Sequence, residues 1–366
     1  MAIFSIKAAF SQHWTQFQWR VGDNFCTVAR DPQGLAPLHL HRYMLASTHL
    51  LLRPIVRAVS LCAMLSCAFQ GNAQDAKQLI ATGDSLLALD KPQRALDVYE
   101  QAVQKASTAE THIARARAYY ELDRLDLFLK DVDKALRLDT GNAEAHFNRA
   151  MYAYRANDLA MADYHATKAL NHATDKKLQT RTLILRGETR AELKRTIPAI
   201  LDLEAGTAVD DSDLEVLRTL ARLYDAAGRH EDALRILTSL CVKDSTDVGH
   251  WSNRSFELIA LGRYPEALIM VEKALDIDKD EPVALSNRGY IYYTMDRIKE
   301  ADHDIDRSLR FYPANPYALR TRALLRIRKG DREKACEDLT LAKALGEIPE
   351  VDRLVKEHCA SDNAPR

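Results

Sequence analysis

Arginine and aspartate recur in this sequence at a fixed separation that lets them form ion pairs. Each Asp follows its Arg by sixteen residues in four places: Arg115 and Asp131, Arg186 and Asp202, Arg288 and Asp304, Arg322 and Asp338. Arg also stands at the first position at two further places without the Asp, Arg149 and Arg254. At one equivalent place both partners are apolar, Leu220 and Ile236, and this internal covariation suggests contact. We predict a structural ion pair at each place. The alternative is a ladder of arginines for an anionic ligand.

These charges recur because the chain itself repeats with a period of 34 residues. One series of alanines keeps this spacing over five members: Ala199, Ala233, Ala267, Ala301 and Ala335. It continues upstream, with slightly different spacings, through Ala162, Phe128 and Ala95. The repeats cover residues 76–108, 109–142, 143–179, 180–213, 214–247, 248–281, 282–315 and 316–349. A period of this size indicates a stacked array of two-element units.

Within each repeat, small residues and turn residues occupy fixed positions. The eighth residue is always Gly, Ala or Ser, and the twentieth is Ala in every repeat except for Phe128. Two helices can cross closely only where side chains are small, so these positions predict the crossing point of a helix pair. The fifteenth residue is Gly, Asn or Asp in every repeat except for Lys194, which predicts a left-handed turn between the helices.

The segments Gly-Arg-His-Glu-Asp-Ala at 228–233 and Gly-Arg-Tyr-Pro-Glu-Ala at 262–267 carry this pattern most clearly. In these motifs the chain resembles the tetratricopeptide repeat (TPR) family, and in particular its exported bacterial members. The resemblance covers residues 74–349 and implies an all-α fold, an α-solenoid of eight helix-turn-helix repeats in a right-handed superhelix with a concave groove. Residues 350–360 are expected to cap the last apolar face, and 361–366 to form a tail.

The resemblance also indicates which residues face the groove. In TPR proteins the sixth position looks into it, and in some members a ladder of Asn side chains there holds a peptide backbone. An amide can both donate to and accept from a peptide unit, and aromatic residues beside amides suit an extended peptide. The alternative is that several of these side chains only pack against neighbouring helices. The peptide-binding candidates are Asn148, Asn253, Phe256, Asn287, Tyr290, Tyr293, Tyr317 and Arg320.

Three cysteines follow the N-terminal region. Cys336 lies near the start of the last second helix and Cys359 near the end of the antiparallel capping helix, so we predict a disulfide between them. The alternative is two free thiols. Cys241 falls at a helix-packing position and is expected to be an inert buried thiol.

The N-terminal region reads as a targeting segment. An apolar run at 58–69 follows Arg53 and Arg57 and precedes small residues up to Ala73, so residues 44–73 are predicted to be a signal peptide. Residues 1–43 show no helix or strand period and are expected to be an over-extended or disordered segment, with translation starting at Met44. Alternatives are a genuine long leader and a lipid anchor at Cys67. The signal predicts export to the periplasm or surface of a bacterium.

Composition and motifs exclude several classes of function for this chain. The 366 residues carry 51 Lys plus Arg and 52 Asp plus Glu, a net charge of −1, which argues against a nucleic-acid partner. No membrane span, no cofactor and no metal site are expected, because the histidines and cysteines lack ligand spacing, and no motif of a catalytic site occurs. We therefore expect a non-enzymatic scaffold with a protein or peptide partner. The alternatives are a nucleic-acid-binding solenoid and an enzyme with its site in the groove.

Overall fold

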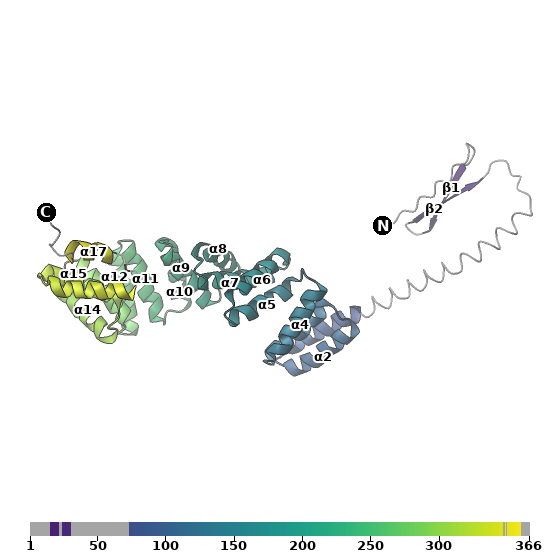
Figure 1. Cartoon of the computed structure of the whole chain (residues 1–366), viewed down its shortest axis with the longest axis horizontal. Coiled ribbons are helices and arrows are strands. Elements are labelled where there is room, and N and C mark those ends of the chain that lie inside the picture. The colour runs from purple at the N-terminus through teal and green to yellow at the C-terminus, as the bar shows by residue number, and fades with distance from the viewer. Residues whose placement is uncertain (1–14, 22–23, 31–72, 347, 349, 360–366) are drawn as a thin grey trace, which may run out of the picture. The chain divides into compact units, whose positions relative to one another are not determined.

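The structure is a computed structural model that describes residues 15–21, 24–30, 73–346, 348 and 350–359 (Figure 1). The chain divides into two units, residues 1–77 and 78–366. Of the predicted signal peptide, residues 44–72 lie outside the described residues and only residue 73 is described. Cys67, the alternative lipid anchor, also lies outside them. Among the helices of the described residues, none has the length and apolar character needed to cross a membrane.

The first unit contains an antiparallel hairpin of β1 (Thr15–Val21) and β2 (Asn24–Arg30), paired from Thr15 opposite Arg30 to Val21 opposite Asn24. The expectation that residues 1–43 have no strand period is wrong here. Phe17, Trp19 and Val21 alternate with polar residues, which is the two-residue period of a strand. The alternation was missed because it spans only seven residues.

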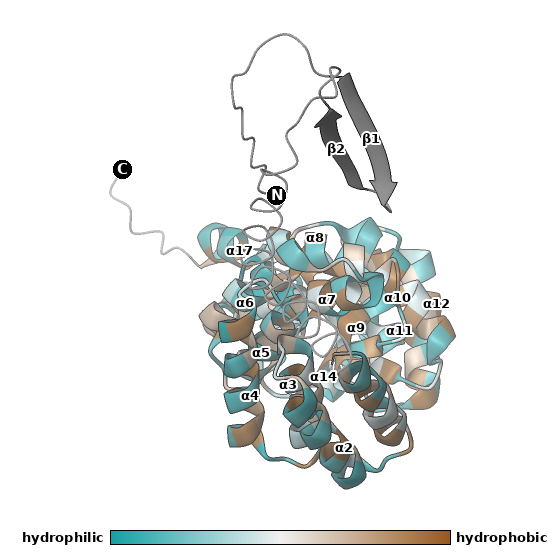
Figure 2. Cartoon of the chain, turned by 90° about the vertical axis from the view of Figure 1, so that its right-hand side faces the viewer, coloured by the Kyte–Doolittle hydropathy of each residue, from teal (hydrophilic) through white to brown (hydrophobic). Residues whose placement is uncertain are grey.

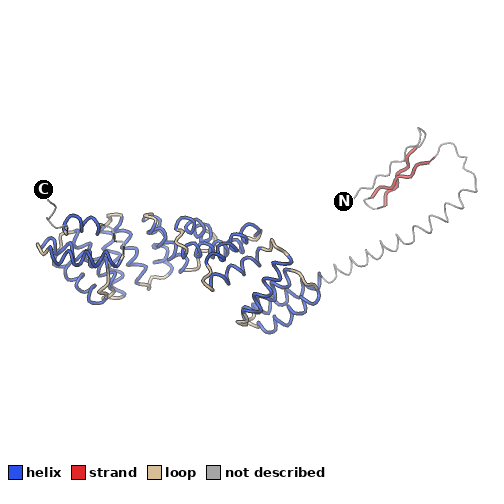
Figure 3. Tube along the Cα trace, in the orientation of Figure 1, coloured by secondary structure: helices blue, strands red, loops and turns tan. Residues whose placement is uncertain are grey.

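The second unit is an all-α, TPR-like solenoid in which consecutive helices pack as antiparallel pairs (Figure 3). Residues 73–88 are helical and precede α2 (Pro92–Lys105). The following pairs are α3 (Ala109–Glu121) with α4 (Leu125–Leu138), α5 (Ala143–Arg155) with α6 (Leu159–His172), α7 (Lys176–Glu192) with α8 (Thr196–Thr207), α9 (Leu214–Ala226) with α10 (His230–Lys243), α11 (Val248–Ala260) with α12 (Tyr264–Ile277), α13 (Pro282–Thr294) with α14 (Ile298–Phe311), and α15 (Pro316–Lys329) with α16 (Arg332–Leu345). The helix α17 (Val351–His358) follows the last pair.

The helices of each pair approach closely at the predicted small residues. A Cβ atom on Gly289 would lie 2.8 Å from Ile305 Cδ1, and one on Gly187 would lie 2.6 Å from Leu203 Cδ2. Real Cβ atoms almost never come so near, so a larger residue at these positions would require the facing side chain or its helix to shift. The alanines of the second helices, such as Ala267 and Ala301, are fully buried at the same crossings.

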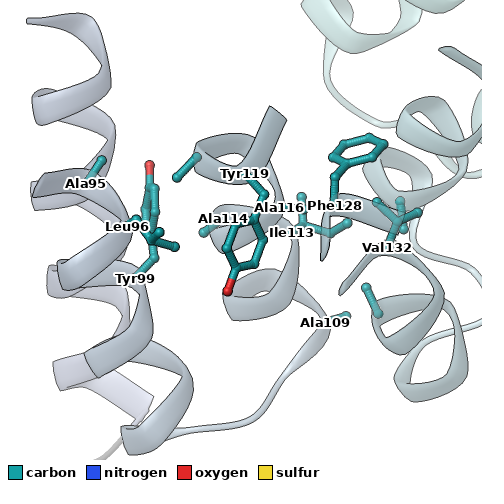
Figure 4. Packing of buried hydrophobic residues seen from close by; sticks show 13 residues of the cluster. Ala95, Leu96, Tyr99, Ala109, Ile113, Ala114, Ala116, Tyr119, Phe128 and Val132 are labelled. Atoms are coloured by element: carbon teal, nitrogen blue, oxygen red, sulfur yellow. The ribbon is translucent and has the colours of Figure 1, made fainter. Parts of the chain in front are cut away.

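Buried apolar residues form a series of clusters that join neighbouring helix pairs along the array. Figure 4 shows this packing at the N-terminal end, where Tyr99, Ile113, Phe128 and Val132 come from three successive helices. In Figure 2 the helices carry a brown apolar strip along one face and a teal polar strip along another. Because each repeat buries its apolar strip against the next repeat, the array is stabilised by contacts between neighbours.

Every predicted turn residue has a positive φ angle, as a left-handed helix end requires. These residues are Asp90, Asp123, Asn157, Lys194, Gly228, Gly262, Asp296 and Gly330, with φ between 54° and 82°. Glycine adopts this conformation without cost and Asn or Asp tolerates it. Lys194 has the same angle, 59°, without that tolerance.

The four predicted Arg–Asp pairs form, each linking the two helices of one repeat through two hydrogen bonds. Arg288 Nε donates to Asp304 Oδ2 at 2.6 Å and its Nη2 donates to Oδ1 at 3.0 Å. Asp304 is 2% exposed. The equivalent bonds join Arg115 to Asp131, Arg186 to Asp202, and Arg322 to Asp338. Because each guanidinium is satisfied by its own carboxylate, the geometry favours the structural interpretation over a ladder for an anionic ligand.

The C-terminal end is closed by α17 and by a disulfide between Cys336 and Cys359, whose Cα atoms are 5.6 Å apart. Val351 and Leu354 of α17 are buried against the last repeat. Cys241 is a buried free thiol, and burial raises its pKa. A raised thiol pKa disfavours the reactive thiolate, as expected for an inert cysteine.

Candidate functional site

A groove opens along the first helices of the last four repeats. Its cavity of about 630 Å³ is bounded by α9, α11, α13 and the start of α15, with Tyr312 and Asn315 from the α14–α15 turn at one end. The first helices line the concave side because α11 contacts α13 and α13 contacts α15, while the second helices pack outside them. Such a cavity can accept an extended chain segment with side chains.

Four of the sequence-predicted residues line this cavity: Asn253, Phe256, Asn287 and Tyr317. Asn253 is exposed, and its amide has no hydrogen-bond partner among the described residues. Phe256 and Tyr317 are half-buried and touch edge to face with ring centroids 5.2 Å apart. Two adjoining rings with an amide beside them provide an apolar seat and a hydrogen-bonding group.

Asn287 has a different role from the one expected of it. Its side chain is 5% exposed, and Nδ2 donates to the Ser252 carbonyl oxygen and to Ser255 Oγ, both at 3.0 Å. The amide therefore joins α13 to α11. Asn287 still lines the groove, but its Nδ2 donor is occupied by bonds within the protein and is not available to a ligand.

Three other candidates lie beside the cavity and do not line it: Tyr290, Tyr293 and Arg320. The Arg320 guanidinium carbon is 4.4 Å from the Tyr290 ring centroid and 5.7 Å from that of Tyr317, and Tyr290 stacks on Tyr293. Arg320 is 7% exposed, and its Nε has no hydrogen-bond acceptor among the described residues. These cation–π contacts support Tyr317 on the side away from the cavity.

Asn148 is separate from the other candidates. It belongs to α5 in the third repeat, does not line the cavity, and is 6% exposed with Nδ2 lacking an acceptor among the described residues. The eight candidates are thus one group of seven on α11, α13 and α15 and one isolated asparagine.

Charged side chains complete the groove. Arg218 of α9 donates to Asp247 Oδ2 at 2.9 Å and to His250 Nε2 at 3.0 Å, whereas the exposed Arg222 makes no ion pair with another described residue. On the same helix Asp225 faces the cavity together with Glu257 of α11. The groove therefore carries cationic and anionic groups side by side.

Sequence reasoning missed Asp225, Glu257 and their shared partner His230. His230 Nδ1 lies 2.9 Å from Glu257 Oε2 and 3.6 Å from Asp225 Oδ1. Burial raises the pKa of Glu257 to about 7, and burial also raises the pKa of Asp225 and of the neighbouring Tyr317. The repeat period could have indicated that Asp225 and Glu257 lie close together. The two residues are nearly one repeat apart, and residues at that spacing lie on neighbouring helices of a solenoid.

Comparisons with known proteins relate the chain to TPR proteins at low similarity. No family model matches the chain. A segment of 105 residues, 28% of this chain, is 27% identical to a "Tetratricopeptide repeat and J domain-containing co-chaperone DNJ1" of Cryptococcus neoformans var. grubii. The chain spans about a fifth of the length of that relative, 20%.

Solved structures resemble the chain in fold. "YrrB: a TPR protein with an unusual peptide-binding site" is 20% identical, with 52% of this chain and 97% of that chain covered, at a TM-score of 0.47. The C-terminal part of a TPR repeat-containing protein from Cytophaga hutchinsonii is 17% identical, with 66% and 98% covered, at a TM-score of 0.46.

Proposed function

We propose that this chain is a non-catalytic scaffold that binds an extended protein or peptide segment in the groove of its last four repeats. The observation that carries the proposal is the groove itself, about 630 Å³ in volume, with an exposed amide, Asn253, beside the paired rings of Phe256 and Tyr317. Aromatic anchors beside amides are typical of surfaces that bind chain segments.

The rigid framework of the groove supports the same proposal. Asn287 fixes α13 to α11, and Arg320 holds Tyr317 from behind, so the groove-lining rings are ordered before a ligand arrives. A preformed site loses little side-chain entropy on binding. The relative named for a peptide-binding site is consistent with this role.

We also propose that the protein works in the bacterial cell envelope. The support is the signal-like segment 44–73, with its basic flank, short apolar run and small residues before Gln74. The Cys336–Cys359 disulfide agrees with an oxidising compartment.

The groove can be tested with a peptide library displayed on phage. Selected peptides would be labelled and their binding measured by fluorescence anisotropy for the full chain and for Phe256→Ala, Tyr317→Ala and Asn253→Ala. Each ring substitution is expected to weaken binding by roughly 10-fold or more, as for a central aromatic anchor.

The matched control is Ile269→Ala on the second helix α12. Ile269 is 54% exposed and does not line the groove, so its loss is expected to leave binding unchanged. Peptides that bind the three groove variants as tightly as the unchanged chain would contradict the proposed surface.

A further inference from the structure

Three side chains that can bind a metal ion come together where the fifth repeat meets the sixth. Asp225 lies in the last turn of α9, His230 is the first residue of α10, and Glu257 lies on α11. One ligand atom from each lies within 4.8 Å of the other two. The turn at Gly228, with φ of 69°, folds His230 back so that its Nδ1 sits between the two carboxylates.

None of these three residues is needed by the repeat framework. Where Glu257 stands, the fifth, seventh and eighth repeats have the buried apolar residues Leu223, Ile291 and Leu325. The equivalents of Asp225 are Ile259, Tyr293 and Ile327, and those of His230 include Tyr264 and Ile298. The position of His230 also holds the polar Thr196 and Arg332, so the departure concerns Asp225 and Glu257. Charged residues at positions that nearby repeats fill with apolar ones mark a functional site more often than a structural one.

With both carboxylates ionised, the cluster carries more negative than positive charge. Glu257 is 3% exposed, and neither it nor Asp225 pairs with an arginine or lysine among the described residues. Two carboxylates share one imidazole, which brings at most a single positive charge. A buried carboxylate such as Glu257 is stabilised when it coordinates a metal, and a divalent cation between the two carboxylates would offset their charge.

We propose that Asp225, His230 and Glu257 form a binding site for a divalent transition-metal ion, with zinc as the best match. Zinc binds imidazole nitrogen and carboxylate oxygen at about 2.0–2.2 Å, which puts neighbouring ligand atoms of a tetrahedron about 3.4 Å apart. The observed separations from His230 Nδ1, 2.9 and 3.6 Å, bracket that value. Calcium and magnesium prefer all-oxygen ligands and fit this set less well.

The site faces the groove, because Asp225 and Glu257 both line its cavity. Three protein ligands would leave a tetrahedral ion with one open position, which a group bound in the groove could occupy. The position of the metal site does not depend on what the groove binds. The metal site can therefore be tested separately from the proposed function.

The test is zinc binding to the full chain after chelation and alkylation of its accessible thiols. We expect one saturable zinc site by isothermal titration, and binding of Co²⁺ at the same site with visible absorption bands of a nitrogen–oxygen site of low coordination number. Glu257→Gln keeps the size of the side chain and its contact with His230 but removes a ligand charge. It is expected to weaken zinc binding by about 100-fold or more, and Asp225→Asn by about 10-fold or more.

The matched control is His303→Gln, which removes an exposed histidine outside the cluster and should leave zinc affinity unchanged. Far-UV circular dichroism of Glu257→Gln verifies that the variant folds. The proposal is overturned if the unchanged chain shows no saturable zinc binding, if folded Glu257→Gln binds zinc as tightly as the unchanged chain, or if only His303→Gln loses binding.

Discussion

Replacing Asp304 by alanine should destabilise the seventh repeat by about 3 kcal/mol. The substitution leaves the Arg288 guanidinium without the acceptor of two hydrogen bonds of 2.6 and 3.0 Å. Removing one partner of a buried pair typically costs about 3–5 kcal/mol because the remaining charge is uncompensated. We choose the lower end, because the Arg288 side chain keeps 21% exposure and can regain some water.

The assay is a double-mutant cycle by urea unfolding, combining Asp304→Ala with Arg288→Met. Hydrogen exchange over α13 and α14 shows whether the loss is local, since a solenoid need not unfold in one step. If the pair acts as described, the double variant is more stable than the sum of the two single costs predicts, by about 2 kcal/mol. Additive costs, or an Asp304→Ala cost below about 0.5 kcal/mol, would refute the reasoning.

Three further predictions concern local features of the array. Replacing Cys336 and Cys359 by serine should lower the stability of the C-terminal end by about 3 kcal/mol, measured as faster hydrogen exchange in α16 and α17, while exchange in α3 stays unchanged. Burial lowers the pKa of His165 to about 4, so the neutral form is favoured in the fold. The contribution of His165 to stability should be fully present above pH 6.5 and be lost as the pH drops from 6.5 to 4 in urea titrations. His165→Asp, which places at this position the aspartate found in other repeats, should remove that contribution. Lys194→Gly should raise the thermal midpoint, because it relieves a side chain at φ 59° by roughly 1 kcal/mol; an unchanged or lower midpoint would contradict this.

The periodic features of the fold were predictable because every repeat solves the same packing problem. Gly289 and Ala301 are small since two helices cross there, and Arg288 and Asp304 vary together since they touch. A single sequence with eight internal copies supplies the comparison that an alignment would otherwise give. The hairpin β1–β2 has no such copies, and its seven-residue alternation was overlooked.

The binding surface was predicted only in part, because a position in the repeat gives the direction of a side chain but not its partners. Asn253 and Asn287 are equivalent in sequence, yet Asn253 is exposed whereas Asn287 bonds to Ser252 and Ser255. Ser255 is the difference, since its hydroxyl is an acceptor that most repeats replace with Ala or Gly. The Asp225–His230–Glu257 cluster was missed because its members come from three helices of two repeats.

The disulfide between α16 and the end of α17 also has a mechanical consequence. If the molecule is pulled by its two ends, the segment between Cys336 and Cys359, 23 residues in separation, cannot lengthen. At about 3.4 Å per residue, the disulfide shortens the fully stretched chain by roughly 80 Å. Force applied at the C-terminus therefore reaches α16 directly, and reduction of the bond should appear in a single-molecule trace as that missing extension.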